Sequence, residues 1–280
     1  MFQDLGGSEV VPSRKQLEAV QGGTADLVNT AASYVGETFP EGLITHFTFG
    51  ATGPEYHKIG LIKALDKIAR ERIGVAVIGS AGYYDFHLFL TKPIKSIHDL
   101  NGMKLRGISL YNPVLHELGV STVRVASAET YSALQTGVID GGAWAGLGVI
   151  QRGIAEVVKY QVYPPFWTAN DMLTFVNAAW LDALPEDARD IVLKVSMRVD
   201  EAAYDLAQKD MGVEVPQVRA MGVQPIVISD EEWWEVQRIS WEKGKAYFRE
   251  VAPEHADELL KLVEQFYPPE RVMWPTYEWR

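Results

Sequence analysis

The stretch that most constrains the fold is residues 129–144, which read Glu-Thr-Tyr-Ser-Ala-Leu-Gln-Thr-Gly-Val-Ile-Asp-Gly-Gly-Ala-Trp. Its first half places apolar residues at helical spacing, and Gly137 can take the left-handed conformation that ends a helix. We expect residues 138–139 to form a short strand and residues 140–142 to turn away from it. A helix leading into a strand with a glycine-rich end, followed here by Trp144, is typical of ligand sites in open α/β sheets. The stretch therefore predicts an α/β protein.

The same pattern occurs once more, near the start of the chain. Residues 17–26 align with residues 131–140, and Ala, Gln, Gly and Asp match at equal spacing. Coincidence is one explanation, because a helix, a glycine and a strand often follow one another. The interval is too long for a solenoid repeat. We interpret the pair as two similar α/β lobes, each using this unit beside a shared cleft.

The order of the other predicted elements supports two discontinuous lobes. Residues 75–78 and 88–91 each predict a strand with no helix between them, so the chain is expected to cross from one lobe to the other there. Residues 187–209 contain good helix formers and no Gly or Pro, and so predict one long bracing helix. Residues 230–251 predict another. The expected lobes are 1–83 plus 172–213 for lobe I, and 84–171 plus 214–280 for lobe II.

Composition excludes several classes of function. The chain has 280 residues, 47% of them apolar, as in a globular protein. Its net charge of −11 argues against general binding of nucleic acids, which are also negatively charged. No apolar run approaches the roughly 20 residues of a membrane span, so no membrane insertion is expected. The absence of Cys removes thiol nucleophiles and thiolate metal ligands, and is compatible with a periplasmic protein.

Enzyme motifs are missing from the sequence. His116 and Glu117 do not make a zinc motif, because Val120 stands where the second His belongs. Residues 79–82 do not form a nucleophile elbow, and residues 146–148 lack the third glycine of a dinucleotide fingerprint. The sequence therefore offers no residue pattern for these classes of enzyme.

Three positions are candidate ligand contacts from their local sequence. Arg106 stands at the end of a short predicted strand before Gly107, where a guanidinium can bind a carboxylate through two hydrogen bonds. A surface ion pair at a sheet edge is an equal alternative. Trp144 fits either a pocket wall or the core. Asn29 begins the small polar segment 29–33, which fits a solvated loop better than a ligand-facing one.

Two motifs carry a resemblance to a known family. Residues 92–106 contain Lys-Pro-Ile, Asp-Leu-Asn-Gly and Lys-Leu-Arg, and residues 129–141 contain Glu-x-Tyr-x-Ala-Leu-Gln-x-Gly-x-x-Asp-Gly. On these motifs the chain resembles the substrate-binding proteins of TRAP transporters, DctP type, over essentially its whole length. The resemblance implies a two-lobed fold of the periplasmic-binding-protein kind (type II-like), with the ligand cleft between the lobes. It also implies a small organic carboxylate as ligand and TRAP membrane subunits as partners. Because apolar strands cross between the lobes without Gly-rich linkers, we expect hinges near residues 82–86 and 170–173.

The resemblance gives roles to individual residues. Arg106 stands at the carboxylate-binding arginine of the family. Trp144 stands where sugar-acid binders have Asn and simple oxo-acid binders have Trp, and Phe86 stands where sugar-acid binders often have a second Arg. The residues we expect to contact the ligand are Arg106, Trp144, Phe86, Tyr83, Asn29, Trp167 and Asn177.

Departures from the family pattern shape the remaining expectations. The family's first strand, helix and strand and its signal peptide do not precede the first motif, so we expect a truncated chain or a misassigned start, and a periplasmic protein. Ala143 and Thr168 stand where metal-assisted members carry acids, so no metal or other cofactor is expected. With Phe86 and Trp144 as walls, the pocket is expected to favour a monocarboxylate with an apolar or aromatic body. An enzyme or a ligand sensor of the same fold stays open as an alternative.

Overall fold

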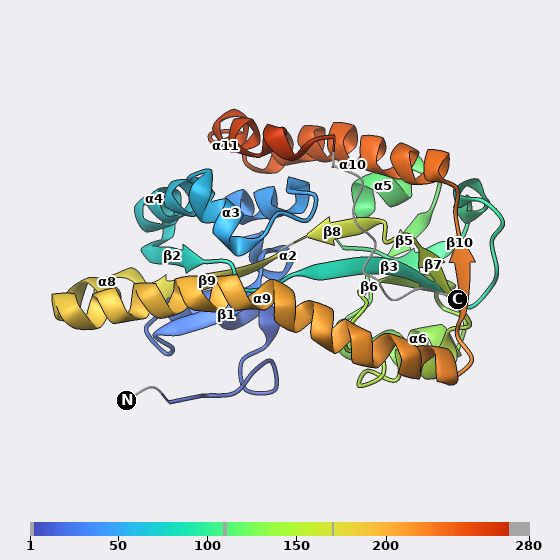
Figure 1. The fold of residues 1–280 in the computed structure, drawn as a ribbon, viewed down its shortest axis with the longest axis horizontal. Helices are drawn as coiled ribbons and strands as arrows, with labels where there is room; N and C mark the ends of the chain where they lie inside the picture. Colours follow the sequence, from blue (N-terminus) through green and yellow to red (C-terminus); the bar gives the residue numbers. More distant parts are fainter. Residues whose placement is uncertain (1–2, 109–110, 170, 269–280) are drawn as a thin grey trace. The chain divides into compact units, whose positions relative to one another are not determined.

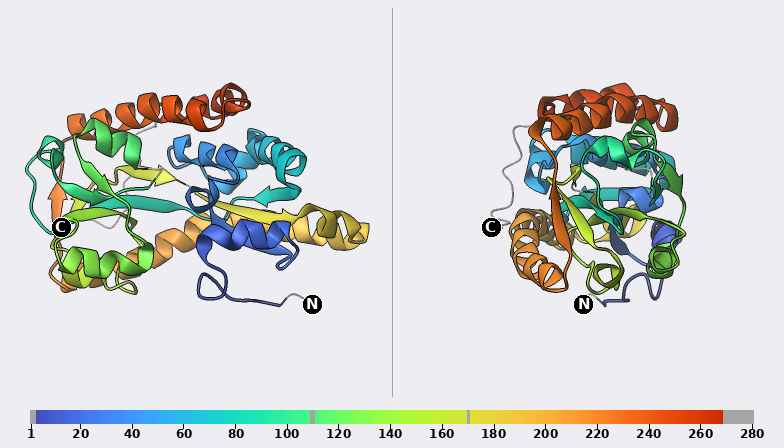
Figure 2. Two further views of the ribbon diagram at one scale, coloured as in Figure 1. Left: turned by 180° about the vertical axis from the view of Figure 1, so that it is seen from behind. Right: turned by 90° about the vertical axis from the view of Figure 1, so that its right-hand side faces the viewer.

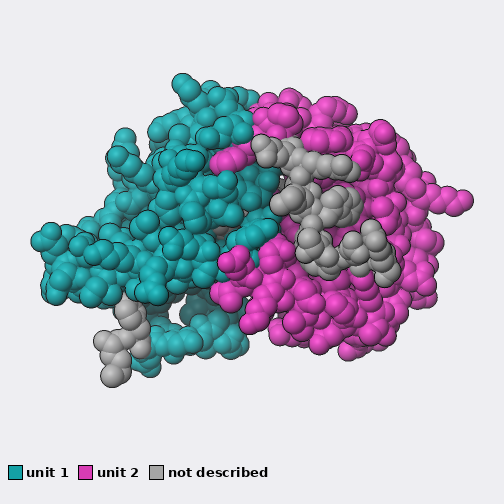
Figure 3. Space-filling view, in the orientation of Figure 1, with its two compact units in different colours: residues 1–83, 170–204, 248–265 teal, residues 84–169, 205–247, 266–280 magenta. Residues whose placement is uncertain are grey.

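The computed structural model describes residues 3–108, 111–169 and 171–268. The chain divides into two compact units, each assembled from separate segments (Figure 3). Unit 1 comprises residues 1–83, 170–204 and 248–265, and unit 2 comprises residues 84–169, 205–247 and 266–280. The first crossing, between residues 83 and 84, lies where the expected lobes also divide. Residues 248–265, which the expectation gave to lobe II, belong to unit 1.

Unit 1 contains a three-stranded sheet in the order β1-β9-β2, with β9 antiparallel to both neighbours. One face of this sheet packs on helices α8 and α9 (Glu186–Ala220), where Val176 of β9 contacts a cluster that includes Leu181 and Val192. The elements of unit 1 are the strands β1 (Leu27–Ala31), β2 (Val75–Gly79) and β9 (Met172–Asn177), and the helices α1 (Gln16–Gln21), α2 (Ala32–Val35), α3 (Gly53–Lys58), α4 (Leu61–Ile73), α8 (Ala178–Ala183) and α11 (Ala256–Val263), with the 3-10 helix η2 (Pro40–Phe47).

Unit 2 contains a seven-stranded sheet in the order β10-β7-β3-β6-β4-β5, with β8 also paired to β3. Strand β3 is antiparallel to β6, β7 and β8, whereas β4 is parallel to β5 and β6. The strands are β3 (Tyr84–Leu90), β4 (Lys104–Arg106), β5 (Ser121–Val123), β6 (Gly141–Ala145), β7 (Tyr160–Tyr163), β8 (Trp167–Ala169) and β10 (Gln224–Val227).

Helices cover both faces of the unit 2 sheet (Figures 1 and 2). On one face, α5 (Asn112–Glu117) and α10 (Asp230–Val251) enclose a core that includes Leu88 and Val236. On the other face lie α6 (Thr130–Gln135), α7 (Ile154–Val157) and the end of α9, around Phe89 and Leu134. The alternation of β3 side chains between the two cores follows from the two-residue period of a strand.

One strand prediction is wrong. Residues 138–139 do not form the strand; β6 is Gly141–Ala145, so the glycines expected in a turn are inside the sheet and Trp144 is a strand residue. Pairing with β3 on one side and β4 on the other fixes this segment as a central strand. Tertiary pairing therefore overrides the low strand propensity of glycine. The expected left-handed residue is confirmed at Gly137, where φ is 73°.

The two long helices differ in how well their bounds agree with the sequence prediction. Helix α10 has the expected bounds of residues 230–251. Helix α9 (Glu186–Ala220) extends beyond the expected end at residue 209 and contains Pro216. Its second half buries Met211, Val215 and Val218, and this packing stabilises helix beyond what local propensity predicts.

Two further expectations concern the membrane and the hinges. Within the described residues, every helix is too short or too polar to cross a lipid bilayer. Of the expected hinge segments, residues 82–86 include the first three residues of β3, residues 172–173 begin β9, and residue 170 lies outside the described part of the chain.

Candidate ligand-binding site

Arg106 and Trp144 lie together on one face of the unit 2 sheet. Arg106 ends β4 and pairs in register with Gly142 on β6, two residues before Trp144. Its side chain is buried, with 5% of its surface exposed, and its Cζ lies 4.5 Å from the centroid of the Trp144 ring. Its Nε donates a hydrogen bond of 3.0 Å to the carbonyl oxygen of Val125. The buried guanidinium thus lies over the face of the Trp144 ring, and its hydrogen bond to Val125 fixes its orientation.

Gly142 makes this arrangement possible. A Cβ atom at Gly142 would lie 3.0 Å from Cβ of Arg106 and 3.1 Å from Cζ3 of Trp144. Any larger residue would push the two side chains apart. The sequence prediction assigned this glycine to a turn and missed the role, because the role depends on which strand pairs beside β6.

The same face of the sheet carries two buried titratable side chains on β3. His87 pairs in register with Trp144, and Asp85 follows at the next position on that face. Burial lowers the pKa of His87 to about 4, opposed by the hydrogen bond of 2.9 Å between its Nδ1 and the carbonyl oxygen of Val162. Burial also raises the pKa of Asp85 to about 6, opposed by the hydroxyl of Thr168. At pH 7, His87 is therefore neutral and Asp85 is largely ionised.

Phe86 and Trp167 lie on the opposite face of this sheet. They pair in register across β3 and β8 and belong to the buried cluster beneath α5 and α10. Tyr111 lies with them, with ring centroids 5.7 Å from Phe86 and 4.8 Å from Trp167. The structure thus separates the expected aromatic residues into two sets, Trp144 with Arg106 and Phe86 with Trp167. Tyr111 was not anticipated from the sequence.

Tyr83 and Asn29 belong to unit 1. The ring of Tyr83 packs edge-on against Tyr204 of α9, with centroids 4.7 Å apart. Asn29 is exposed on β1, and its Nδ2 donates a hydrogen bond of 3.0 Å to Oγ1 of Thr174 on β9. It also borders a cavity of about 970 Å³ that is lined by the N-terminal segment, β1, α8 and α9.

Asn177 caps a helix. Its Oδ1 accepts a hydrogen bond of 2.9 Å from the backbone N–H of Trp180, which lies in the first turn of α8. Its Nδ2 donates a hydrogen bond of 2.9 Å to the carbonyl oxygen of Val20. Both ends of the amide thus hold local structure, as expected for an Asn at the N-cap position.

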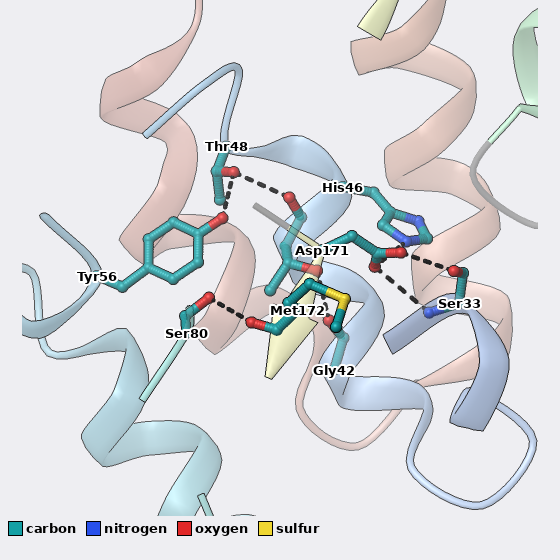
Figure 4. Close-up of polar contacts among 9 residues, drawn as sticks. Ser33, Gly42, His46, Thr48, Tyr56, Ser80, Asp171 and Met172 are labelled. Carbon is teal, nitrogen blue, oxygen red and sulfur yellow. Dashed lines mark hydrogen bonds and ion pairs between the residues drawn. The ribbon is translucent and has the colours of Figure 1, made fainter. Parts of the chain in front are cut away.

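A buried polar cluster in unit 1 surrounds Asp171 (Figure 4). Its carboxylate accepts a hydrogen bond of 2.6 Å from the hydroxyl of Ser33 and lies 2.9 Å from Nε2 of His46. Ser33 and His46 both contact the acid, so these three residues do not form the nucleophile–base pair that acyl transfer needs. The cluster fastens α2 and η2 to the start of β9. The sequence prediction of a loop over residues 29–33 is wrong, since this segment ends β1 and begins α2.

Comparison with known proteins now identifies the family. The sequence pattern of the bacterial extracellular solute-binding proteins, family 7 (DctP), matches residues 5–250. The chain belongs to this family. A curated relative is the monocarboxylate 2-oxoacid-binding periplasmic protein all3028 of Nostoc sp., 28% identical over 244 residues, which are 84% of this chain and 66% of that protein. The chain thus spans less than two thirds of this relative.

Solved structures of the family share the fold. A TRAP periplasmic solute-binding protein from Desulfovibrio salexigens with bound orotic acid has a TM-score of 0.78 and 23% identity, over 90% of this chain and 83% of the other. One from Rhodoferax ferrireducens with bound malonate has a TM-score of 0.76 and 23% identity, over 92% and 84%. The resemblance stated from the motifs and the expected two-lobed α/β fold class are confirmed. DctP-family proteins are substrate-binding receptors and not enzymes, which agrees with the motifs missing from this sequence.

The expectation that no metal binds was based on two residues of unit 2, Ala143 and Thr168. Within the described ranges, no group of three or more His, Asp or Glu side chains is placed to hold a metal ion. Ala143 is fully buried in the core beneath α10, and Thr168 pairs with Asp85 across β8 and β3. Neither residue contributes a carboxylate.

Proposed function

We propose that this chain is a periplasmic receptor for a small organic acid with one carboxylate and an apolar body, which it delivers to the membrane subunits of a TRAP transporter. The observation that carries the proposal is the buried guanidinium of Arg106, fixed by Val125 and lying over Trp144. The bound orotate of the Desulfovibrio relative and the 2-oxoacids of the Nostoc relative, both organic acids with one carboxylate, support it.

The charge of the chain explains why a local cation is needed. A net charge of −11 repels an organic anion at long range. A guanidinium removed from water regains its lost hydration best from a carboxylate, which it can bind through two parallel hydrogen bonds. Arg106 is therefore the group on which we place the ligand's carboxylate.

The titratable groups on the same face of the sheet, on β3 beyond β6, favour one carboxylate over two. His87 is neutral at pH 7 because burial holds its pKa near 4, and Asp85 adds negative charge to the same face. A second ligand carboxylate would lose its hydration there without gaining a matched cation, and an unpaired buried ion costs on the order of several kcal/mol. The indole of Trp144 instead offers dispersion to an apolar body.

The ligand class is tested by calorimetry on the purified chain. Orotate and 4-methyl-2-oxopentanoate are compared with malonate and 2-oxoglutarate, each with and without a chelator, after mass spectrometry has identified any copurified acid. We expect the monocarboxylates to bind at least tenfold more tightly and the chelator to change nothing. Tighter binding of malonate, or loss of affinity in chelator, would contradict the proposed ligand class. Uptake by TRAP membrane subunits in reconstituted vesicles tests delivery separately.

A further inference from the structure

Asp85 and His87 carry buried polar atoms without hydrogen-bond partners on one face of the unit 2 sheet. Each residue has 1% of its surface exposed. Among the described residues, neither carboxylate oxygen of Asp85 accepts a hydrogen bond, and Nε2 of His87 makes none either. The hydroxyl of Thr168 lowers the pKa of Asp85 without meeting hydrogen-bond geometry. Because buried polar atoms are nearly always hydrogen-bonded, these three atoms indicate a bound group.

All three atoms are acceptors at pH 7. Nδ1 of His87 lies 2.9 Å from the carbonyl oxygen of Val162, which can only accept, so Nδ1 carries the proton of the neutral ring. The remaining nitrogen, Nε2, is therefore an acceptor, and the ionised carboxylate of Asp85 accepts only. The two side chains cannot bond to each other in these states. A group with at least two N–H or O–H donors can satisfy both.

The geometry of β3 suits one small bridging group. Asp85 and His87 stand two residues apart on this strand, so their side chains leave the same face about 7 Å apart. An atom that donates to both at about 2.9 Å can join acceptor atoms up to about 6 Å apart. Gly146 provides space beside them, since a Cβ atom there would lie 3.6 Å from Cδ2 of His87 and 3.7 Å from Sδ of Met211. These are ordinary contact distances, so a group the size of a methyl fits beside the imidazole.

We propose that an ammonium ion binds between Asp85 and His87. Its charge matches that of the carboxylate, and its four N–H groups can donate to both residues at once. Hard metal cations suit the pair less, because they prefer several oxygen ligands to an imidazole nitrogen. Over residues 3–108, 111–169 and 171–268, no group of three His, Asp or Glu side chains is placed to hold a metal ion. The net charge of −11 attracts cations to the protein.

The ammonium site is distinct from the proposed carboxylate site. Arg106 lies on β4, and β6 separates β4 from β3 in the sheet. A bound ammonium ion would hold Asp85 in its ionised form and offset its charge, without making this part of the face positive. A second ligand carboxylate would still meet no matched cation there. The inference therefore goes beyond the proposed function and does not depend on it.

Thermal unfolding of the full chain, without added organic acid, tests which ion binds. The protein is compared at pH 7 in ammonium, sodium and potassium chloride at equal ionic strength. We expect ammonium alone to raise Tm, by about 3 °C, because an ion that binds only the folded state stabilises it by mass action. Nuclear magnetic resonance with ¹⁵N-labelled ammonium chloride should show a protein-bound signal that sodium and potassium do not displace. Equal Tm values in the three salts, with no bound signal, would overturn the proposal.

Three substitutions test where the ion binds. Asp85→Asn removes the charge, should stay folded and should remove the ammonium-specific rise in Tm. His87→Asn can keep a hydrogen bond to Val162 through its amide but loses the acceptor at Nε2, so it should weaken ammonium binding about tenfold. Asp171→Asn, at a buried acid of unit 1 whose oxygens already have hydrogen-bond partners, should keep the full rise. An ammonium effect that survives in folded Asp85→Asn, or is lost equally in Asp171→Asn, would contradict the proposed site.

Discussion

The two helix–glycine–strand segments share their local structure and differ in their place in the sheet. In unit 1, α1 is followed by Gly23, with φ of 70°, and by β1. In unit 2, α6 is followed by Gly137, with φ of 73°, and by β6. Strand β1 lies at the edge of three strands, whereas β6 lies between β3 and β4. Equivalent sequences therefore build one edge strand and one central strand.

The difference in position decides what each strand contributes. Leu27 begins β1 with 38% of its surface exposed and borders the cavity of unit 1. The aligned Gly141 begins β6 in a buried position, and three residues later Trp144 meets Arg106 on the neighbouring strand. The candidate site thus arises from the central position of β6, which brings β4 beside it, and not from the repeated segment alone.

Substitutions at the first residue of each strand are expected to differ most in how far they lower the free energy of unfolding. A Cβ atom at Gly141 would collide with the carbonyl oxygen of Phe89 and lie 2.8 Å from Cδ2 of Leu90. Gly141→Ala should therefore destabilise the protein by about 3 kcal/mol, as for overpacked cores. Leu27→Val, at the aligned edge position, should cost about 0.5 kcal/mol or less. Thermal unfolding of both variants measures the two losses of stability. Equal losses would contradict the expected difference between the edge strand β1 and the central strand β6.

Substitutions of the acid before each strand are expected to show an intermediate difference in their cost to the free energy of unfolding. Burial alone would raise the pKa of Asp140, but the Lys92 ammonium at 2.7 Å and the Lys104 N–H at 3.0 Å hold it below its ordinary value. Asp140→Asn should cost about 2 kcal/mol at pH 7. The aligned Asp26 is exposed, so Asp26→Asn should cost about 0.5 kcal/mol or less.

The pH dependence of the Asp140 effect follows from the direction of its shift. A lowered folded pKa stabilises the fold above the unfolded pKa of about 3.9, and this contribution is lost as the pH falls through the folded pKa. Denaturant unfolding should therefore show the gap between wild type and Asp140→Asn closing from about pH 5 towards about pH 2. A gap that is constant over this range would mean that the carboxylate contacts are not the source of the effect.

Substitutions of the two left-handed glycines are expected to differ least in their cost to the free energy of unfolding. Among the described residues, a Cβ atom added at Gly23 or at Gly137 would meet no atom from elsewhere in the chain within 4 Å, so only backbone strain opposes a side chain there. Gly23→Ala and Gly137→Ala should each cost about 1 kcal/mol. Unfolding midpoints should fall by similar amounts, and a clearly larger loss at one site would show that the segments differ before their strands begin.

The sequence predicted local structure better than it predicted the site. Gly137 and α10 were predictable because left-handed caps and helical periodicity depend on neighbouring residues in the chain. The start of β6 was not predictable, because only pairing with β3 and β4 makes a strand of two glycines. The separation of Phe86 from Trp144 onto opposite faces depends on strand register, where a slip of one residue exchanges the faces. A single sequence does not fix that register.

The most direct measurement is the affinity of Arg106→Ala and Arg106→Met for the tightest-binding monocarboxylate of the calorimetric panel. Met keeps apolar packing against Trp144, and Lys104→Ala removes the same charge from an exposed position on β4 as a control. Loss of a buried arginine–carboxylate pair costs about 2–5 kcal/mol, so both Arg106 variants should bind tens to thousands of times more weakly while remaining folded. Lys104→Ala should stay within about twofold of the wild-type affinity, since exposed charges contribute little. Wild-type affinity in a folded Arg106 variant would contradict the assignment of the carboxylate site.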